Sequence, residues 1–276
     1  MGSALTYRLR ALGERLRGKR RTGPFSRRHA ALALDLARAR NRILDESDPV
    51  VRSFLKYAFG KGGISHSQIF QDAFVLYALG EKTNGFFCDF GSTDGVFLSN
   101  SHSLEEHFGW TGICAEPARS WHADLRRNRP KAYIETDCVW SHTGETLTFS
   151  ETRSKELSTI AAYRGSDSHA RRRRRGTETY DVQTISLNDL LTKYDAPADF
   201  DYLSMDTEGS ELDILKTFDL THYRPKVITI EHNYTESRNA IFQLLTAHGY
   251  TRVLPEVSMF DDWYLAPGIN LPASVT

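Results

Sequence analysis

The sequence lacks long hydrophobic runs and has little cysteine. No apolar run approaches the roughly 20 residues that span a bilayer, and the first residues contain no apolar segment of the kind that a secretory signal requires. We therefore expect an intracellular, cytoplasmic protein. The three cysteines, Cys88, Cys114 and Cys138, are odd in number and far apart, and each lies within an apolar segment. This pattern indicates buried thiols rather than a disulfide framework or a zinc site.

The net charge of the chain is zero, but its basic and acidic residues are unevenly distributed along the sequence. Residues 1–60 hold 14 Lys and Arg against 5 Asp and Glu, and the remainder is correspondingly acidic. Apolar residues at helical spacing in this basic arm, namely Leu32, Leu36, Ala39 and Ile43, predict an amphipathic helix. Two interpretations remain open: the apolar stripe packs on the body of the protein, or the arm makes peripheral contact with an anionic membrane or glycolipid.

A glycine-rich stretch at residues 60–63 separates the arm from the rest of the chain. We expect a basic helical extension over residues 1–63 and a single domain over residues 64–276. In this domain, helical and strand patterns alternate, which predicts parallel βαβ units with helices on both faces of a sheet. Strands are expected at residues 86–90, 112–115, 132–138, 202–205 and 227–231, and helices at residues 68–79, 99–108, 118–128 and 236–247.

The two final strand patterns and a polar insertion complete the predicted organisation. Residues 250–257 and 261–267 lie too close together for a crossover helix, so we expect a hairpin with an antiparallel strand at the sheet edge. Residues 151–179 interrupt the alternation and indicate an insertion. Its run Arg171–Arg175 predicts an exposed loop. Nucleic acid is not expected as a partner, because no aromatic residues alternate with these arginines and the domain is acidic.

Polar residues follow the expected strands repeatedly, where parallel sheets bind their ligands. One acid alone would be explained as a helix cap. Five strand ends in succession instead predict a ligand site, formed by Asp89 and Asp94, by Glu116, by Asp137 with Cys138, by Asp206 and Glu208, and by Glu231, His232 and Asn233.

The loop after the first strand, Gly91 to Gly95, indicates which ligand this is. It lacks the G-x-G-x-x-G spacing of a pyrophosphate cradle, and its carboxylates would repel that anion. S-adenosylmethionine carries a sulfonium and an ammonium group and no phosphate. We therefore expect Gly91 and Gly95 to let the backbone approach this cofactor, and Asp89 or Asp94 to favour its cationic methionine portion.

Further candidates surround this loop. Glu116 is expected to accept the ribose hydroxyls, although an acid favoured by a helix N-terminus after Pro117 is the alternative. Asp137 and Cys138 fall where the adenine edge would lie. Gln68, Gln71 and Asp72 belong to the helix before the first strand, where they either close the pocket or form a polar outer face.

Together, these residues and their neighbouring segments resemble the FkbM family of S-adenosylmethionine-dependent methyltransferases. The resemblance covers residues 67–267 and rests on the segments SQIFQDAFVL (67–76), GFFCDFGSTDGVFLSNSHSLE (85–105), GWTGICAEP (109–117), DYLSMDTEGSELDIL (201–215), ITIEHN (228–233) and DDWY (261–264). It implies an α/β, Rossmann-like class I methyltransferase fold, whose seven-stranded, mostly parallel sheet ends in a reversed hairpin. Ser92 and Asn100 lie in the second segment and are added to the expected cofactor-binding residues.

The resemblance also implies an activity, because family members mostly methylate hydroxyl groups on glycans, lipids and secondary metabolites. A hydroxyl acceptor must lose its proton, for which Asp206, Glu208, Glu231 and His232 are the catalytic candidates. In one alternative, Asp206, Glu231 and Asn233 hold Mg²⁺ or Mn²⁺. In the other, His232 or Asp206 acts as the general base and Glu231 orients the imidazole. His232 could equally be an imidazole that a strand-end backbone group satisfies.

Other functions fit the sequence less well. An oxidoreductase would need a phosphate-binding turn, and amino-methylating nucleic-acid enzymes place two prolines where this chain has Thr207 and Glu208. A methyltransferase fold that has lost catalysis and binds glycans or membranes stays as the alternative to O-methylation of a sugar, glycolipid or secondary metabolite.

Overall fold

The computed structural model describes residues 27–152, 158–160 and 178–272, and the chain divides into two compact units, residues 1–47 and 48–276. In the first unit, helix α2 (Arg27–Glu46) confirms the helix expected from Leu32 to Ile43. None of the helices that the structure describes is long and apolar enough to cross a membrane.

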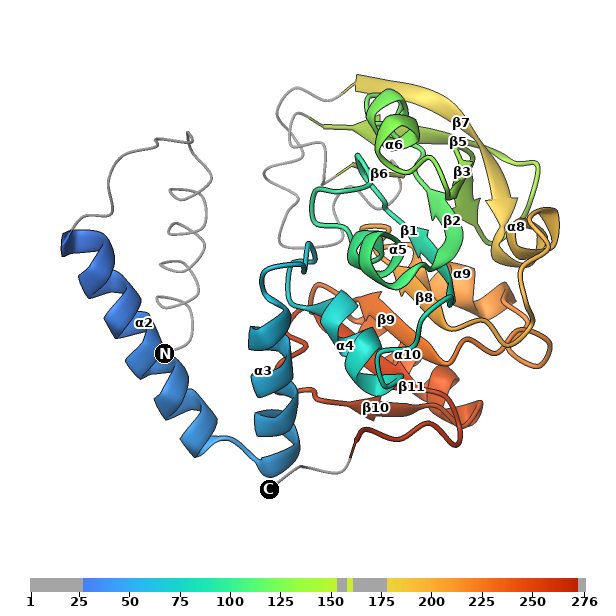
Figure 1. Cartoon of the computed structure of the whole chain (residues 1–276). Coiled ribbons are helices and arrows are strands. Elements are labelled where there is room, and N and C mark those ends of the chain that lie inside the picture. The colour runs from blue at the N-terminus through green and yellow to red at the C-terminus, as the bar shows by residue number, and fades with distance from the viewer. Residues whose placement is uncertain (1–26, 153–157, 161–177, 273–276) are drawn as a thin grey trace. The chain divides into compact units, whose positions relative to one another are not determined.

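The second unit is built on a seven-stranded sheet (Figure 1). The strand order is β10 (Thr251–Val253), β11 (Asp261–Leu265), β9 (Val227–Glu231), β8 (Tyr202–Met205), β1 (Phe86–Phe90), β2 (Thr111–Ala115) and β3 (Tyr133–Glu135). All neighbours are parallel except β11, which runs antiparallel to both β9 and β10. The class I methyltransferase fold is thereby confirmed. The expected final hairpin is formed by β10 and β11. Its antiparallel strand, β11, lies between β9 and β10, so β10 rather than β11 is the edge strand of the sheet.

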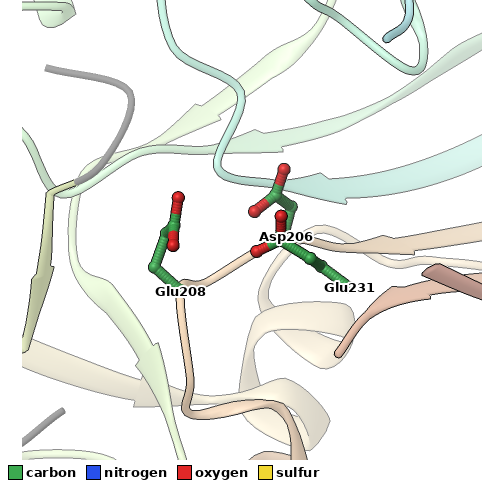
Figure 2. Close-up of side chains that lie close together, drawn as sticks. All are labelled: Asp206, Glu208 and Glu231. Atoms are coloured by element: carbon green, nitrogen blue, oxygen red, sulfur yellow. The ribbon is translucent and has the colours of Figure 1, made fainter. Parts of the chain in front are cut away.

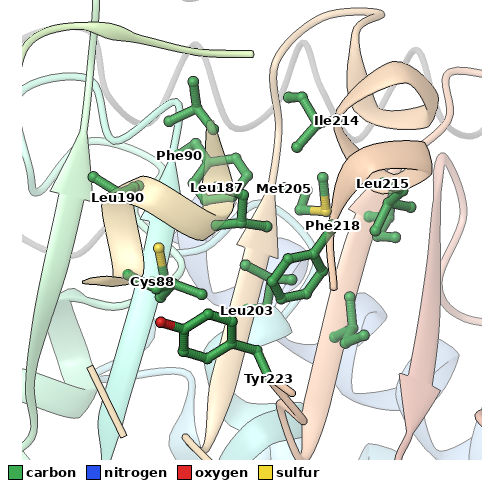
Figure 3. Close-up of a cluster of buried hydrophobic side chains, with 14 of the residues drawn as sticks. Cys88, Phe90, Leu187, Leu190, Leu203, Met205, Ile214, Leu215, Phe218 and Tyr223 are labelled. Atoms are coloured by element: carbon green, nitrogen blue, oxygen red, sulfur yellow. The ribbon is translucent and has the colours of Figure 1, made fainter. Parts of the chain in front are cut away.

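Helices cover both faces of this sheet because its central strands are apolar on both sides. On one face Cys88 and Phe90 pack with the helices α8 (Leu187–Lys193), α9 (Glu211–Thr217) and α10 (Ser237–Ala247), and Figure 3 shows this core. On the other face Phe87 packs with α3 (Pro49–Lys61), α4 (Gln71–Ala78), α5 (His102–Phe108) and α6 (His122–Asn128). Alternate residues of β1 therefore enter different cores.

Helix α3 belongs to the sheet-containing unit, although the sequence analysis placed it in the basic extension. Asp48 caps the helix by accepting a hydrogen bond from the Val50 N–H, and Pro49 occupies its first turn. The Phe54 ring is fully buried and meets Trp263 of β11 edge to face at 5.5 Å. This apolar contact gives α3 its place, whereas charge and glycine content suggested a boundary after it.

The expected strand at residues 132–138 is divided between two sheets. The N–H groups of Thr136 and Asp137 both donate to Glu135 Oε1, at 2.8 and 3.0 Å, and turn the chain after β3. A second, four-stranded sheet then follows in the order β4 (Cys138–Trp140), β7 (Glu178–Ser186), β5 (Thr146–Glu151) and β6 (Thr159–Ile160). The polar segment expected as an insertion is thus flanked by paired strands, and the Arg171–Arg175 run lies outside the described residues.

Candidate active site

The glycine loop after β1 lies against the end of β8. Gly91 has a φ of +76°, and a Cβ atom on it would lie 2.1 Å from the backbone oxygen of Asp206. Only glycine fits such an approach. Gly95 has a φ of +83°, and its Cβ would meet Arg129 Cγ at 2.5 Å. The lack of a side chain at these two positions thus lets the loop pack closely against Asp206 and Arg129. The close approach that the structure shows is to other residues of this chain, whereas the sequence analysis expected an approach to the cofactor.

The two acids expected beside the methionine portion of the cofactor have different surroundings. Asp89 is buried and accepts a hydrogen bond from Ser101 Oγ at 2.5 Å. Burial raises the pKa of Asp89, and its hydroxyl partners Ser101 and Ser204 and the nearby Arg129 oppose that rise. Asp94 is half-buried, and its Oδ1 accepts the N–H groups of Val96 and Phe97. Asp94 therefore stabilises its own loop.

Ser92 and Asn100 are buried next to Asp89. Ser92 Oγ donates to the Asp89 carbonyl at 2.7 Å, and Asn100 Nδ2 donates to Ser204 Oγ at 3.1 Å. The Asn100 Oδ1 atom is buried and has no hydrogen-bond partner within the described part of the chain. A buried acceptor without a partner is costly, so this atom fits a bound donor such as an ammonium group.

Glu116 joins the glycine loop to the end of β2. Its Oε2 accepts the Thr93 N–H at 2.9 Å and its Oε1 accepts the Ala118 N–H at 2.8 Å. Burial raises the pKa of Glu116 to about 8. Helix α6 begins only at His122 rather than at Ala118, so Glu116 does not lie at a helix N-terminus. Each carboxyl oxygen keeps a second lone pair, which fits a pair of ribose hydroxyls.

Asp137 and Cys138 follow β3, as the adenine interpretation requires. Asp137 is half-buried. Cys138 is buried against Ala118 and Phe149, and burial raises the pKa of its thiol to about 12. The thiol is therefore neutral and provides an apolar wall rather than a nucleophile.

Three carboxylates converge where β8 and β9 end (Figure 2). One carboxylate oxygen from each of Asp206, Glu208 and Glu231 lies within 4.8 Å of the others, and we call these residues the acid cluster. Glu208 enters it because the chain turns at this residue, with a φ of +60°. Asn233, the third metal ligand expected from the sequence, donates from Nδ2 to Glu208 Oε2 at 3.4 Å. Asn233 thus lies beside the acid cluster, and Glu208 joins the two acids that the sequence analysis named as metal ligands.

Glu208 and Glu231 are the two buried members of the acid cluster, and Glu231 has the more unusual surroundings. It is more than nine-tenths buried, and its Oε2 atom finds no hydrogen-bond partner among the described residues. Burial and the neighbouring acids Asp206, Glu208 and Asp261 raise its pKa well above the ordinary value. Such an oxygen is a site for a proton or a cation.

Asp261 is a fourth acid at this edge, and the sequence analysis gave it no role. It pairs in register with Glu231, accepts a hydrogen bond from Gln71 Nε2 at 2.9 Å, and has a pKa raised to about 8 by burial and by Asp206. The signal was available, because an antiparallel last strand starts at the edge where its parallel neighbours end. Asp261, at the start of β11, therefore belongs to the candidate site.

The residues expected on the helix before β1 separate into two groups. Gln68 precedes α4 and is exposed. Gln71 and Asp72 are buried, which excludes the alternative of a polar outer face. Asp72 accepts hydrogen bonds from the hydroxyls of Ser65, Ser67 and Ser103 at 2.6 to 2.7 Å and so fixes the chain before α4.

His232 is buried, and its ring faces Asp262 rather than Glu231, the residue that one alternative expected to orient it. Its Nδ1 accepts the Tyr234 N–H at 2.9 Å, and its Nε2 lies 3.8 Å from Asp262 Oδ1, on the strand face opposite to Glu231. Burial lowers its pKa. The lone pair of the neutral ring is already used by Tyr234, which favours the interpretation of an imidazole satisfied by the backbone over that of a general base.

Comparisons with known proteins list several methyltransferases among the similar solved structures. Similar solved structures include a methyltransferase from Geobacter sulfurreducens (12% identity, 84% of this chain and 96% of that one, TM-score 0.40). They also include an O-methyltransferase from Bacillus cereus in complex with SAH (10% identity, 82% and 96%, TM-score 0.38). A third is the precorrin-6y C5,15-methyltransferase from Geobacter metallireducens (12% identity, 71% and 87%, TM-score 0.39). Likenesses this distant carry no argument about the site. No curated protein gives a significant match.

The reversed hairpin and the strand order define a class I methyltransferase fold. The sequence profile of the methyltransferase FkbM domain matches residues 89–252, which is more than half of the chain. The chain therefore belongs to the FkbM methyltransferase family, and it is an S-adenosylmethionine-dependent methyltransferase.

Proposed function

We propose that this methyltransferase transfers the methyl group to a hydroxyl oxygen of a sugar, glycolipid or secondary metabolite. The acid cluster carries the proposal. An alcohol becomes a good nucleophile only if a nearby group takes its proton, and three carboxylates meet at the strand ends beside the glycine loop.

The surrounding residues fit the cofactor. Asn100 Oδ1 offers a buried acceptor to its ammonium group, and Glu116 offers lone pairs to its ribose hydroxyls. When bound, S-adenosylmethionine supplies an electrophilic methyl group whose bonding electron pair stays on sulfur. The chain's own tasks are to hold the acceptor hydroxyl near the acid cluster and to receive its proton, for which we assign Asp206. Its position next to Gly91 places it where β1 and β8 meet.

The experiment is a transfer assay with labelled S-adenosylmethionine against a panel of sugars, glycolipids and polyketide alcohols. Asp206→Ala should lower kcat by about 10²-fold or more, while cofactor affinity stays within about tenfold. Asp213→Asn, a partly exposed acid on α9 paired with Lys216, is the matched control and should behave as the wild type. Unchanged turnover of Asp206→Ala would remove this residue from the catalytic role.

We also propose that the acid cluster holds Mg²⁺ or Mn²⁺. Asp206, Glu208 and Glu231 supply hard oxygen donors, and Glu231 Oε2 is buried without a hydrogen-bond partner among the described residues. Two vicinal hydroxyls of an acceptor suit such an ion. Calorimetric titration with Mn²⁺ alone should detect binding that Glu231→Gln weakens, and a chelator should reduce turnover. Full turnover in chelator would leave proton removal to the carboxylates themselves.

A further inference from the structure

The four-stranded sheet reaches the acid cluster at one threonine, to which the proposed chemistry gives no role. Thr159 lies in β6 and is buried, and its Oγ1 donates a hydrogen bond to the Glu208 carbonyl at 3.1 Å. The two residues are 49 positions apart in the sequence. This bond therefore joins the second sheet to the loop that carries two members of the acid cluster, Asp206 and Glu208.

The backbone of Glu208 is held in an unfavourable conformation. Its φ of +60° lies in the left-handed region, which is uncommon for residues with a side chain and persists only where the surroundings impose it. The turn brings the Glu208 carboxylate close to those of Asp206 and Glu231 (Figure 2). The contacts that fix this turn therefore also fix the geometry of the acid cluster.

One group of contacts comes from the loop itself. The Glu211 side chain is buried, and its Oε1 accepts hydrogen bonds from the Thr207 N–H at 3.0 Å, the Thr207 hydroxyl at 2.8 Å and the Gly209 N–H at 3.1 Å. The residues before and after Glu208 are thus tied to a single oxygen atom. These bonds are local, because Glu211 follows the turn by only a few residues.

The peptide group between Glu208 and Gly209 is held at both ends. Its N–H donates to Glu211, and its carbonyl accepts the bond from Thr159. Gly209 has a φ of +126°, and because glycine tolerates many values of φ, this peptide group can rotate at low steric cost. Such a rotation would also change the ψ angle of Glu208 and redirect its carboxylate. The Thr159 bond opposes this rotation from outside the loop.

Thr159 is itself fixed by the four-stranded sheet. It pairs in register with Ser150 of β5. The next residue, Ile160, points to the opposite face of the strand and packs in the same apolar cluster as Cys138, the residue expected at the adenine edge. Strand β6 therefore contacts the candidate site in two places, the apolar wall through Ile160 and the acid cluster through Thr159.

We propose that Thr159 is a positioning residue of this methyltransferase. Its hydroxyl holds the Glu208 carbonyl and thereby keeps the Glu208 carboxylate in the acid cluster. The four-stranded sheet then takes part in building the catalytic edge, in addition to extending the fold. The effect on catalysis rests on the proposed function, since it requires the acid cluster to act on the acceptor hydroxyl, whereas the effect on the Glu208 backbone does not.

The first experiment observes the Glu208 backbone without methyl transfer. Glu208–Gly209 is the only Glu–Gly pair in the sequence, so the full chain labelled with ¹³C-carbonyl glutamate and ¹⁵N-glycine should give a single carbonyl–amide correlation by NMR. In Thr159→Val, which removes the hydroxyl but keeps the shape, the carbonyl resonance should move upfield. The Gly209 amide should also exchange with solvent about tenfold faster. Thr159→Ser retains the donor and should leave both unchanged.

The second experiment measures turnover with the best acceptor from the transfer assay. Thr159→Val should lower kcat by about tenfold while the KM for S-adenosylmethionine stays within about threefold, and Thr159→Ser should keep most of kcat. In the Glu208→Gln background, Thr159→Val should cause no further loss of kcat, which a general loss of structure would not produce. Ser150→Ala is the matched control. It removes the buried hydroxyl opposite Thr159, which has no hydrogen-bond partner among the described residues, and should behave as the wild type.

The possible failures can be told apart. A Glu208 carbonyl resonance that does not respond to Thr159→Val overturns the proposal, and so does an equal response to Ser150→Ala. A resonance that moves while kcat stays unchanged shows a bond that catalysis does not need, which overturns the positioning role. If no alcohol is methylated, the proposed function fails instead, and the NMR experiment still decides whether Thr159 holds Glu208.

Discussion

At the scale of single residues, the candidate site depends on Gly91, where the loop after β1 meets the backbone of Asp206 at the end of β8. Gly91→Ala should lower cofactor affinity and kcat/KM by about tenfold or more, because its Cβ would meet the Asp206 carbonyl at 2.1 Å and displace one of the two strand ends. Gly80→Ala is the matched control: Gly80 has a similar φ of +60° but nothing within 4 Å. It should cost about 1 kcal/mol of stability without affecting the cofactor. Equal effects of the two variants in calorimetry and kinetics would refute a specific role for the contact.

Glu116 makes stability depend on pH. Its pKa is about 8 in the folded chain against an ordinary value of 4.5, so between these values the folded state keeps a proton that the unfolded state has lost. Its contribution to stability is therefore present below about pH 4.5 and is lost as the pH rises through about 8.

Glu116→Gln should remove this dependence. The free energy of unfolding, from urea titrations at about pH 5 and about pH 9, should fall less with rising pH in the variant than in the wild type. The change of unfolding free energy with pH is the decisive quantity, rather than its value at one pH, because the amide also changes the hydrogen bonds to Thr93 and Ala118. An identical slope in both proteins would show that Glu116 is ionised across the range.

At the scale of elements, α2 is the part of the basic arm that the structure describes within the first unit. We propose that the arm contacts anionic membranes, since it carries Arg38, Arg40 and Arg42 within one helix and the rest of the chain is acidic. Replacing these three arginines with Gln in the full chain should weaken binding to phosphatidylserine vesicles by about tenfold or more, and more strongly at low salt.

The control for the arm is a pair of arginines elsewhere. Arg126→Gln with Arg127→Gln on α6 changes the charge of the second unit and should leave vesicle sedimentation unaltered. If both sets of substitutions act alike, the vesicles respond to net charge and the arm has no special role.

At the scale of the whole molecule, cofactor binding should stabilise the second unit. S-adenosylhomocysteine at about 100 times its Kd should add about 2.7 kcal/mol to the free energy of unfolding. Thermal unfolding with and without the ligand measures this, with NAD⁺ as the control ligand. Stabilisation by NAD⁺ alone would contradict the assignment of the glycine loop.

The sequence predicted the central sheet well because its strands are buried on both faces. The strands β1, β8 and β9 were expected at the residues where they lie, since each is a short, mostly apolar run bounded by polar residues. The division between β3 and β4 was missed, because it depends on the turn that Glu135 stabilises with its own side chain.

The site was predicted less completely, because its contacts join distant parts of the chain. The strand-end rule identified Asp206, Glu208 and Glu231 but gave no role to Asp261, which reaches the same edge from an antiparallel strand. In one of the alternatives from the sequence, Glu231 was expected to orient the His232 imidazole. Successive residues of a strand point to opposite faces, and this alternation places its ring against Asp262 instead.

The place of β11 also bears on how the protein is made. This strand inserts between β9 and β10, yet it is translated after every other strand of the sheet. On the ribosome, β10 has no neighbour in the sheet until residues 261–265 have emerged, and Asp261 joins the edge of the site at the same moment. The edge of the candidate site is therefore completed by the last strand of the sheet to be synthesised, so its geometry depends on the chain having been translated through β11.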